Sequence, residues 1–286
     1  MIERIAILGT GLLGTSVGLA LRASGYRGSI TGWNRGTEQA EAALRMGAVD
    51  SVSKHLLQVG RECDVVLIAV PIFATLDIME QLAGMLGPDQ LLTDVGSTKA
   101  QIAAAGMRLF NQPGRAAFLP GHPMAGKERG GAALGDPNLF RGAVWIFTED
   151  ARAQRTARAA ALTRAWREQV KALGAKTVDL DPVRHDELVA WVSHLPQFAA
   201  TAMSALLEDQ VGDAPELKDV GGRALREMTR LGASPFSMWR DIAHTNTEHI
   251  EAVLQAFEQR LAHLRENLRN PQLRDEFDRA NRFRQG

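Results

Sequence analysis

The stretch Arg4–Gly14, which reads RIAILGTGLLG, decides the fold of this chain. Its first half is an apolar run typical of a buried strand, its second half is the pattern G-x-G-x-x-G, and a helix is expected over 15–24. Gly9 permits a tight turn, Gly11 lets the backbone approach a pyrophosphate, and Gly14 lets the helix pack on the strand. The stretch therefore predicts a dinucleotide-binding turn.

The cofactor contacts are expected to extend beyond the glycines. The amides of Leu12 and Leu13, at the start of the helix, are expected to face the phosphates. A second strand, over 29–34, ends ~20 residues after the loop, where an NAD site usually has a carboxylate for the ribose 2′-hydroxyl. This chain has Asn34 and Arg35 instead. With a cation and no anion at this position, we expect NADP to be preferred over NAD. In the alternative, Arg35 stacks on adenine or is solvated, and Asn34 bonds the ribose of either cofactor.

An alternation of strands and helices continues as far as residue 180. Val70 and Pro71, at the end of the third strand, are expected to contact the cofactor. A last helix near 151–173 and a strand at 176–180 are expected to complete one doubly wound sheet, whose other strands after residue 34 are expected at 64–71, 91–95, 116–119 and 144–148. Beyond Asp181 the pattern is helical. The sequence thus predicts an α/β Rossmann-type domain over 1–180 and an all-helical domain over 181–286.

One helix in the second part carries a heptad pattern. Its apolar residues are spaced four, three, four, three and four apart: Ile250, Leu254, Phe257, Leu261, Leu264 and Leu268. A stripe of this length usually packs against a second long helix, and a partner subunit can supply one. We therefore expect a homodimer formed through the helical domain, although a core within one subunit is the alternative.

The composition is that of an ordinary globular protein. The 286 residues are 45% hydrophobic and 23% charged, with 33 Lys and Arg against 33 Asp and Glu. This balance gives no reason to expect nucleic acid or a membrane as a partner. The chain starts directly in its first strand and has no apolar run of about eighteen residues, so a cytoplasmic protein is expected. A single cysteine, Cys63, excludes an internal disulfide and a cysteine-based metal cluster, and no metal is expected.

A histidine stands out in the run 118–126, which reads FLPGHPMAG. His122 is expected in a Gly/Pro turn after a short strand, and strand ends are where open α/β sheets bind ligands. It is therefore a candidate acid or base. The alternative is a loop histidine that caps a helix or faces solvent.

Three other polar positions are candidates for contact with a small ligand. Ser97, in DVGSTK over 94–99, follows a strand and is expected near the nicotinamide, as a helix N-cap, a substrate contact or both. His194 lies in WVSHLPQ over 191–197. Arg230 stands among Met and Leu, where an arginine is rarely buried without an anion; a salt bridge to a neighbouring acid is the alternative.

These motifs together resemble the prephenate and arogenate dehydrogenases of tyrosine biosynthesis, over nearly the whole length. The resemblance rests on five segments in the family's order: GTGLLGTS over 9–16 with Gly18, DVGSTK over 94–99, GHPMAG over 121–126 with Glu128, SHLP over 193–196, and Gly221-Gly222 followed by Met228-Thr229-Arg230. It implies a dinucleotide-binding domain followed by a helical dimerisation domain. The implied reaction is oxidative decarboxylation of prephenate to 4-hydroxyphenylpyruvate, of arogenate to tyrosine, or of both, with hydride transfer to NAD(P)+.

The resemblance also implies roles for individual residues. It implies that His122 is catalytic with Ser97 beside it, and that Arg230 holds a substrate carboxylate. His194 is expected to line the pocket, and Glu128 is a further candidate for substrate binding. Gln197 occupies a position where prephenate-specific members often have histidine, which leaves the choice between keto and amino substrate open. Since the chain ends in a charged helix near 273–284, no chorismate mutase or regulatory domain is expected.

Two other interpretations remain open. A β-hydroxyacid or imine dehydrogenase of similar architecture would use Lys99 as its acid or base. A dinucleotide-binding sensor without chemistry would need only the first domain, and it would leave His122 and Arg230 unexplained.

Overall fold

The computed structural model describes residues 1–285, apart from the side chain of Lys218. The chain divides into two compact units, each described by itself: the first comprises Met1–Leu188 and Ala233–Thr245, and the second comprises Val189–Gly232 and the chain from Asn246 onward. The boundary expected near residue 180 stays a prediction.

The first unit is built on a six-stranded parallel sheet with the order β3-β2-β1-β4-β5-β6, the order of a dinucleotide-binding sheet. Its strands are β1 (Arg4–Leu8), β2 (Ser29–Trp33), β3 (Ser51–Val52), β4 (Val65–Ile68), β5 (Leu91–Asp94) and β6 (Ala117–Leu119). In the register, Ile5 pairs with Ile30 on one side and Val65 on the other. The predicted α/β Rossmann-type fold is confirmed.

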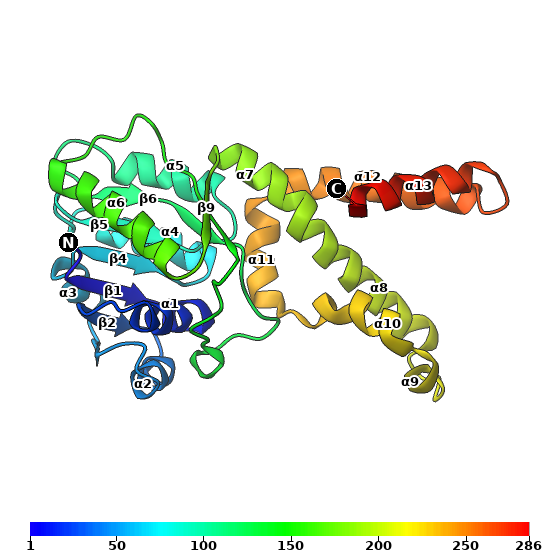
Figure 1. Cartoon of the computed structure of the whole chain (residues 1–286), viewed down its shortest axis with the longest axis horizontal. Helices are drawn as coiled ribbons and strands as arrows, with labels where there is room; N and C mark the ends of the chain where they lie inside the picture. The colour runs from blue at the N-terminus through cyan, green and yellow to red at the C-terminus, as the bar shows by residue number, and fades with distance from the viewer. Residues whose placement is uncertain (286) are drawn as a thin grey trace. The chain divides into compact units, whose positions relative to one another are not determined.

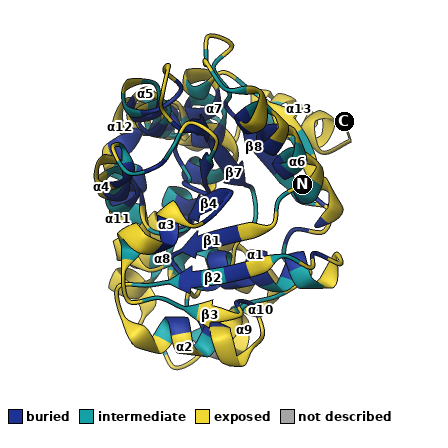
Figure 2. Cartoon of the chain, turned by 90° about the vertical axis from the view of Figure 1, so that its left-hand side faces the viewer, coloured by how far each residue is buried: buried dark blue, intermediate teal, exposed yellow. Residues whose placement is uncertain are grey.

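The two central strands are apolar, as expected for strands of a sheet that helices cover on both faces. Residues 5–8 of β1 and all of β4 are buried, which is typical of parallel strands enclosed on both faces. Figure 2 shows β1 and β4 in dark blue for most of their length, whereas α2 carries exposed residues in yellow. This rigid centre brings the loops after β1, β4 and β5 to the same edge of the sheet (Figure 1).

The prediction of one doubly wound sheet was wrong for its last two strands. Strands β7 (Gly121–Pro123), β8 (Val144–Phe147) and β9 (Lys176–Asp179) form a separate sheet, in which β7 is antiparallel to β8 and β8 is parallel to β9. Strand periodicity cannot tell which sheet a strand joins, since that depends on long-range packing. Trp145 and Phe147 of β8 lie in the core of the unit.

The helical segments of the first unit lie between and after its strands. Helix α6 begins later than expected, because Thr156 caps it by accepting a hydrogen bond from the Ala159 amide at 3.1 Å. The helices are α1 (Leu12–Ala23), α2 (Thr37–Arg45), α3 (Leu56–Arg61), α4 (Ile72–Leu82), α5 (Ala100–Leu109), η1 (Ala132–Leu134), α6 (Ala157–Ala172), α7 (Pro182–Val189, whose last residue falls in the second unit) and α11 (Phe236–Thr245).

The second unit is helical, as predicted. Its elements are η2 (Ala190–His194), α8 (Leu195–Val211), α9 (Leu217–Val220), α10 (Gly222–Thr229), η3 (Arg230–Ala233, whose last residue falls in the first unit), α12 (Thr247–Glu266) and α13 (Gln272–Gln285). Along the heptad pattern Ile250 is buried, whereas Leu261 and Leu268 are exposed, and Leu268 lies beyond the end of α12. Across the described residues, no helix combines the length and apolar character needed to cross a membrane.

Candidate functional site

The glycine loop between β1 and α1 has the geometry that its sequence predicts. Gly9 has a φ of +102°, and a Cβ there would lie 2.3 Å from the carbonyl oxygen of Ala69. A Cβ on Gly14 would lie 1.9 Å from the oxygen of Gly9. At Gly11, by contrast, a Cβ would meet no described atom within 4 Å. The first and third glycines are therefore needed for the fold, and the second leaves space for a ligand.

The surroundings of the loop suit a pyrophosphate. Helix α1 starts at Leu12 with Gly11 as its N-cap and no side-chain cap, so the amides of its first turn face the loop. Thr10 is fully buried, and its Oγ1 has no hydrogen-bond partner among the described residues. An orphaned hydroxyl beside uncapped helical amides fits a ligand rich in acceptor oxygens.

The other expected cofactor residues lie at the same edge of the sheet. Asn34 follows β2, where its Nδ2 donates to the Gly36 carbonyl at 3.0 Å, and Arg35 beside it is exposed. Val70 follows β4 and packs against the loop: a Cβ on Gly9 would lie 2.6 Å from its Cγ1. Pro71 is the N-cap of α4. The residues chosen from sequence are thus brought together in one unit.

A buried ion pair fixes the segment after β5. The Lys99 Nζ lies 2.5 Å from Asp94 Oδ2 and also donates to the Gly121 carbonyl at 2.9 Å, with both charged side chains 0% exposed. Burial lowers the pKa of Lys99, and pairing with Asp94 opposes that shift. Asp94 Oδ1 accepts a hydrogen bond from the Gly121 amide at 3.1 Å. The segment 94–99 is therefore tied to the backbone directly before His122.

His122 and Ser97 depart from their expected settings. His122 lies within β7, not in a turn, because residues 121–123 pair with β8. Ser97 is half-buried in the loop before α5, but Lys99 is the N-cap residue of that helix. The cap is instead the carboxylate of Asp186, which accepts the Lys99 amide at 2.7 Å and the Ala100 amide at 2.9 Å.

Two residues that lie beside His122 were not among the candidates chosen from sequence. His122 Nδ1 lies 2.8 Å from His185 Nε2, and His185 Nδ1 lies 2.7 Å from Asp186 Oδ1. The three side chains are all buried. The adjacent pair His185 and Asp186, shortly after Pro182, could have been chosen as a candidate from sequence. Their contact with His122 could not, because His185 and His122 are 63 positions apart.

The remaining candidates of the second unit surround the start of α8. His194 is buried at the end of η2, a π-helix, and its Nδ1 lies 3.2 Å from Asn246 Nδ2. Such short π-helical turns are frequent at functional sites. Gln197 is buried, and its Nε2 donates to the Leu231 carbonyl at 2.7 Å and to Thr201 Oγ1 at 3.1 Å.

The structure does not place Arg230 in a buried apolar setting. Helix α10 has no buried residue, Met228 is 61% exposed, and Arg230 at the end of that helix is exposed as well. Arg230, His194 and Gln197 belong to the second unit, whereas Glu128 is half-buried in the first, in the loop after β7.

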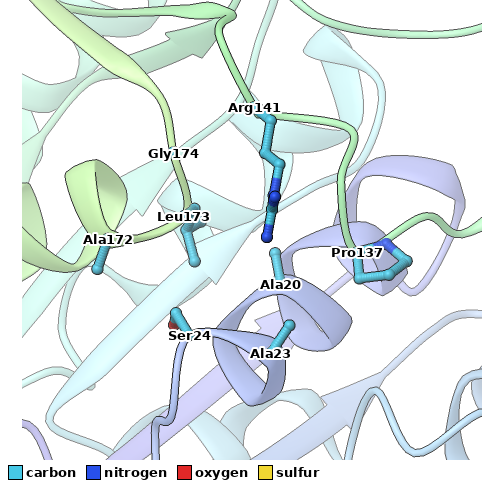
Figure 3. Close-up of a pocket in the computed structure, with 8 residues that line it drawn as sticks. All are labelled: Ala20, Ala23, Ser24, Pro137, Arg141, Ala172, Leu173 and Gly174. Carbon is cyan, nitrogen blue, oxygen red and sulfur yellow. The ribbon is translucent and has the colours of Figure 1, made fainter.

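A cavity of about 250 Å3 lies elsewhere in the first unit, at the end of α1 far from the glycine loop (Figure 3). Its walls come from the last turns of α1 and α6 and from the loop that carries Pro137 and Arg141. The Arg141 side chain points toward α1 in Figure 3. A cation is favoured at the carboxyl end of a helix, which is where this side chain points.

The fold and the glycine loop together define a dinucleotide-binding protein of the Rossmann class with a helical second part. Residues 17–177 match the family profile described as prephenate dehydrogenase, nucleotide-binding domain, and residues 181–282 match prephenate dehydrogenase, dimerization domain. The chain belongs to the prephenate dehydrogenase family.

Relatives of known name and solved structures agree with this family. Prephenate dehydrogenase of Lactococcus lactis is 32% identical over 86% of this chain and 66% of its own length, and that of Bacillus subtilis is 31% identical over 87% and 66%. The chain thus spans just under two thirds of these relatives. The crystal structure of prephenate dehydrogenase from Aquifex aeolicus, in complex with hydroxyphenyl propionate and NAD+, has a TM-score of 0.86 at 26% identity and covers 100% of this chain and 98% of that one. Synechocystis arogenate dehydrogenase has a TM-score of 0.76 at 27% identity, covering 99% of both.

Among the described residues, no group of three or more His, Cys, Asp or Glu side chains is arranged to hold a metal ion.

Proposed function

We propose that this protein oxidatively decarboxylates prephenate, arogenate or both, with hydride transfer to NAD(P)+. The observation that carries the proposal is a buried imidazole, His122, in the same unit as the glycine loop and tied through Gly121 to the loop after β5. Relatives named prephenate dehydrogenase and cyclohexadienyl dehydrogenase support the substrate class.

The reaction makes specific demands on the chain. The substrate is a cyclohexadienol with a hydroxyl on C4 and a carboxylate on C1; hydride leaves C4, carbon dioxide leaves C1, and aromatisation drives the reaction. The nicotinamide, when bound, accepts the hydride. The chain has to supply a base for the 4-hydroxyl proton, a cation for carboxylate and a fixed geometry.

We assign these tasks to the residues chosen from sequence. His122 takes the hydroxyl proton, Ser97 orients the hydroxyl, and Arg230 pairs with a substrate carboxylate. His194 and Glu128 are assigned to substrate binding.

Gln197 is assigned to the substrate side chain. Its Nε2 already donates two hydrogen bonds within the second unit, which weighs against donation to a keto oxygen.

The direct test is a spectroscopic assay. The purified protein is mixed with NADP or NAD and with prephenate or arogenate, and reduced cofactor is followed at 340 nm. Reduction with either substrate, and none with a β-hydroxyacid, is the expected result. Reduction with β-hydroxyacids alone would move the chain to the alternative class. The full burial of Lys99 weighs against that class, because Lys99 would be its acid or base and has no access to a substrate.

For the cofactor we propose NADP over NAD, on the strength of exposed Arg35 and the absence of a carboxylate at residues 34 and 35. Arg35→Ala is expected to weaken NADP binding by about 1–3 kcal/mol while NAD binding changes little, because the lost contact is a charge-assisted pair with the 2′-phosphate. Cofactor titrations by fluorescence measure both affinities. Arg45→Ala, at an exposed arginine on α2, is the matched control. Equal losses for NADP and NAD would show that Arg35 stacks on adenine and selects neither.

The role of Arg230 leads to a separate prediction. Arg230→Ala is expected to raise KM for prephenate and arogenate alike, by a factor that corresponds to about 2–4 kcal/mol, because a carboxylate common to both loses its partner. Steady-state kinetics with each substrate provide the measurement, and Arg226→Ala, in helix α10 directly before Arg230, is the control. A change confined to one substrate would mean that Arg230 recognises the side chain that differs between them.

We also propose that the chain is a homodimer with a nucleotide-binding domain over 1–180 and a helical domain over 181–286. The two matching profiles end and begin at residues 177 and 181, and the second is described as a dimerization domain. The exposure of Leu261 and Leu268 on the heptad pattern supports a partner at that surface.

A further inference from the structure

Three side chains form a continuous row of hydrogen bonds inside the first unit. Asp186 and His185 lie in the middle of α7, and His122 lies in β7. The contacts measure 2.7 Å from Asp186 Oδ1 to His185 Nδ1 and 2.8 Å from His185 Nε2 to His122 Nδ1. His185 is 0% exposed, Asp186 1% and His122 8%, so bulk water contributes little to this row.

The direction of the row follows from what each group is able to donate. Asp186 accepts backbone amides on both oxygens, from Lys99 and Ala100, as a carboxylate does. A carboxylate cannot donate, so the hydrogen between Asp186 and His185 belongs to His185 Nδ1. This assignment holds whatever the charge of His185.

The charge of His185 then fixes the next hydrogen. Burial lowers the pKa of His185, the Asp186 hydrogen bond opposes that shift, and the Lys99 ammonium adds to it. A neutral His185 with its hydrogen on Nδ1 has a bare Nε2, which accepts. The hydrogen between the two imidazoles therefore belongs to His122 Nδ1, and the nitrogen of neutral His122 that carries no hydrogen is Nε2.

We propose that His185 and Asp186 are positioning residues that hold His122 in the tautomer with hydrogen on Nδ1, so that its Nε2 is the base of the reaction. This inference rests on the proposed function for the identity of the proton that is removed. The 4-hydroxyl O–H bond breaks, an Nε2–H bond forms, and His122 becomes an imidazolium. Its Nδ1–H continues to donate to His185, and the carboxylate of Asp186 stabilises the new charge through that ring.

A purely structural role is the competing explanation. Asp186 caps α5, and the two imidazole rings pack edge to face with centroids 5.0 Å apart and an angle of 64°. Such a role needs burial and shape but no particular tautomer. The variants should therefore keep Asp186, and with it the cap of α5, and should differ from one another in the acceptor that His122 meets; both lose the hydrogen bond from His185 Nδ1 to Asp186.

His185→Leu removes the acceptor, and His185→Gln provides another one, since the Gln oxygen can reach the region of the lost Nε2. We expect kcat to fall about 10–100-fold in the Leu variant, with KM for substrate nearly unchanged, and to recover in large part in the Gln variant. The rise of kcat with pH should also shift in the Leu variant. His55→Leu, at an exposed histidine, is the control.

The second readout needs neither substrate nor activity. Long-range 1H–15N spectra of the 15N-histidine-labelled protein identify the tautomer of each ring, and His122→Asn assigns the His122 signals. We expect the Nδ1–H tautomer for His122 in the parent protein and its loss in His185→Leu. An Nε2–H tautomer in the parent protein, or an unchanged kcat in the folded Leu variant, would overturn the proposal. Absence of dehydrogenase activity with the expected tautomer would instead refute the proposed function and leave the hydrogen-bond row supported.

Discussion

His122→Asn is expected to lower turnover by about 10²–10⁴-fold, the range associated with a positioned general base. The variant should fold and bind cofactor normally, because the asparagine amide occupies the region of Nδ1 and can still donate to His185 at the position now bonded at 2.8 Å. What it lacks is a basic nitrogen where the imidazole has Nε2. Single-turnover kinetics with prephenate and with arogenate measure the loss of the chemical step directly.

The pH profile separates a lost base from a damaged fold. In the parent protein, turnover should fall at low pH as the base becomes protonated, and this limb should be absent in the variant. His55→Asn, at an exposed position, should behave like the parent. Parent-like turnover in His122→Asn would remove His122 from the mechanism.

Lys99→Met is expected to lower the free energy of unfolding by about 3–5 kcal/mol, because it leaves the carboxylate of Asp94 buried without its cation. The pair is fully enclosed, at 2.5 Å, and the same ammonium holds the Gly121 carbonyl. Urea denaturation followed by circular dichroism measures the change.

A double variant shows whether the unpaired charge is the cause. Lys99→Met with Asp94→Asn removes both charges, and the second substitution should recover a large part of the lost stability. If the double variant is as unstable as the single one, lost packing is responsible. At a temperature where Lys99→Met is folded, a loss of turnover of about 10²–10⁴-fold would return the acid/base role to Lys99.

Sequence predicts the parts of the site that depend on local backbone geometry. The glycine loop is one such part. Gly9 needs a positive φ, and a side chain on Gly14 would collide with the carbonyl of Gly9, so residues close in sequence decide the conformation. The end of β2, with Asn34 and Arg35, follows from the same unit of strand, turn and helix.

Sequence does not predict contacts that depend on how distant segments pack. Strand β8 has the same apolar pattern whichever sheet it joins, and its antiparallel pairing with β7 is a long-range outcome. A lysine is normally assigned to the surface, so burial of Lys99 was not expected. The sequence did indicate one thing: Asp94 ends a buried strand, and a buried carboxylate is normally accompanied by a cation.

The carboxylate of Asp186 joins two segments in a single opening event. Because it holds the first amides of α5 and the ring of His185, a fluctuation that frees α7 exposes the Lys99 and Ala100 amides to solvent and releases the imidazole row at the same moment. Hydrogen-exchange protection of these two amides thus reports the fraction of molecules in which the hydrogen bonds that orient His122 are intact.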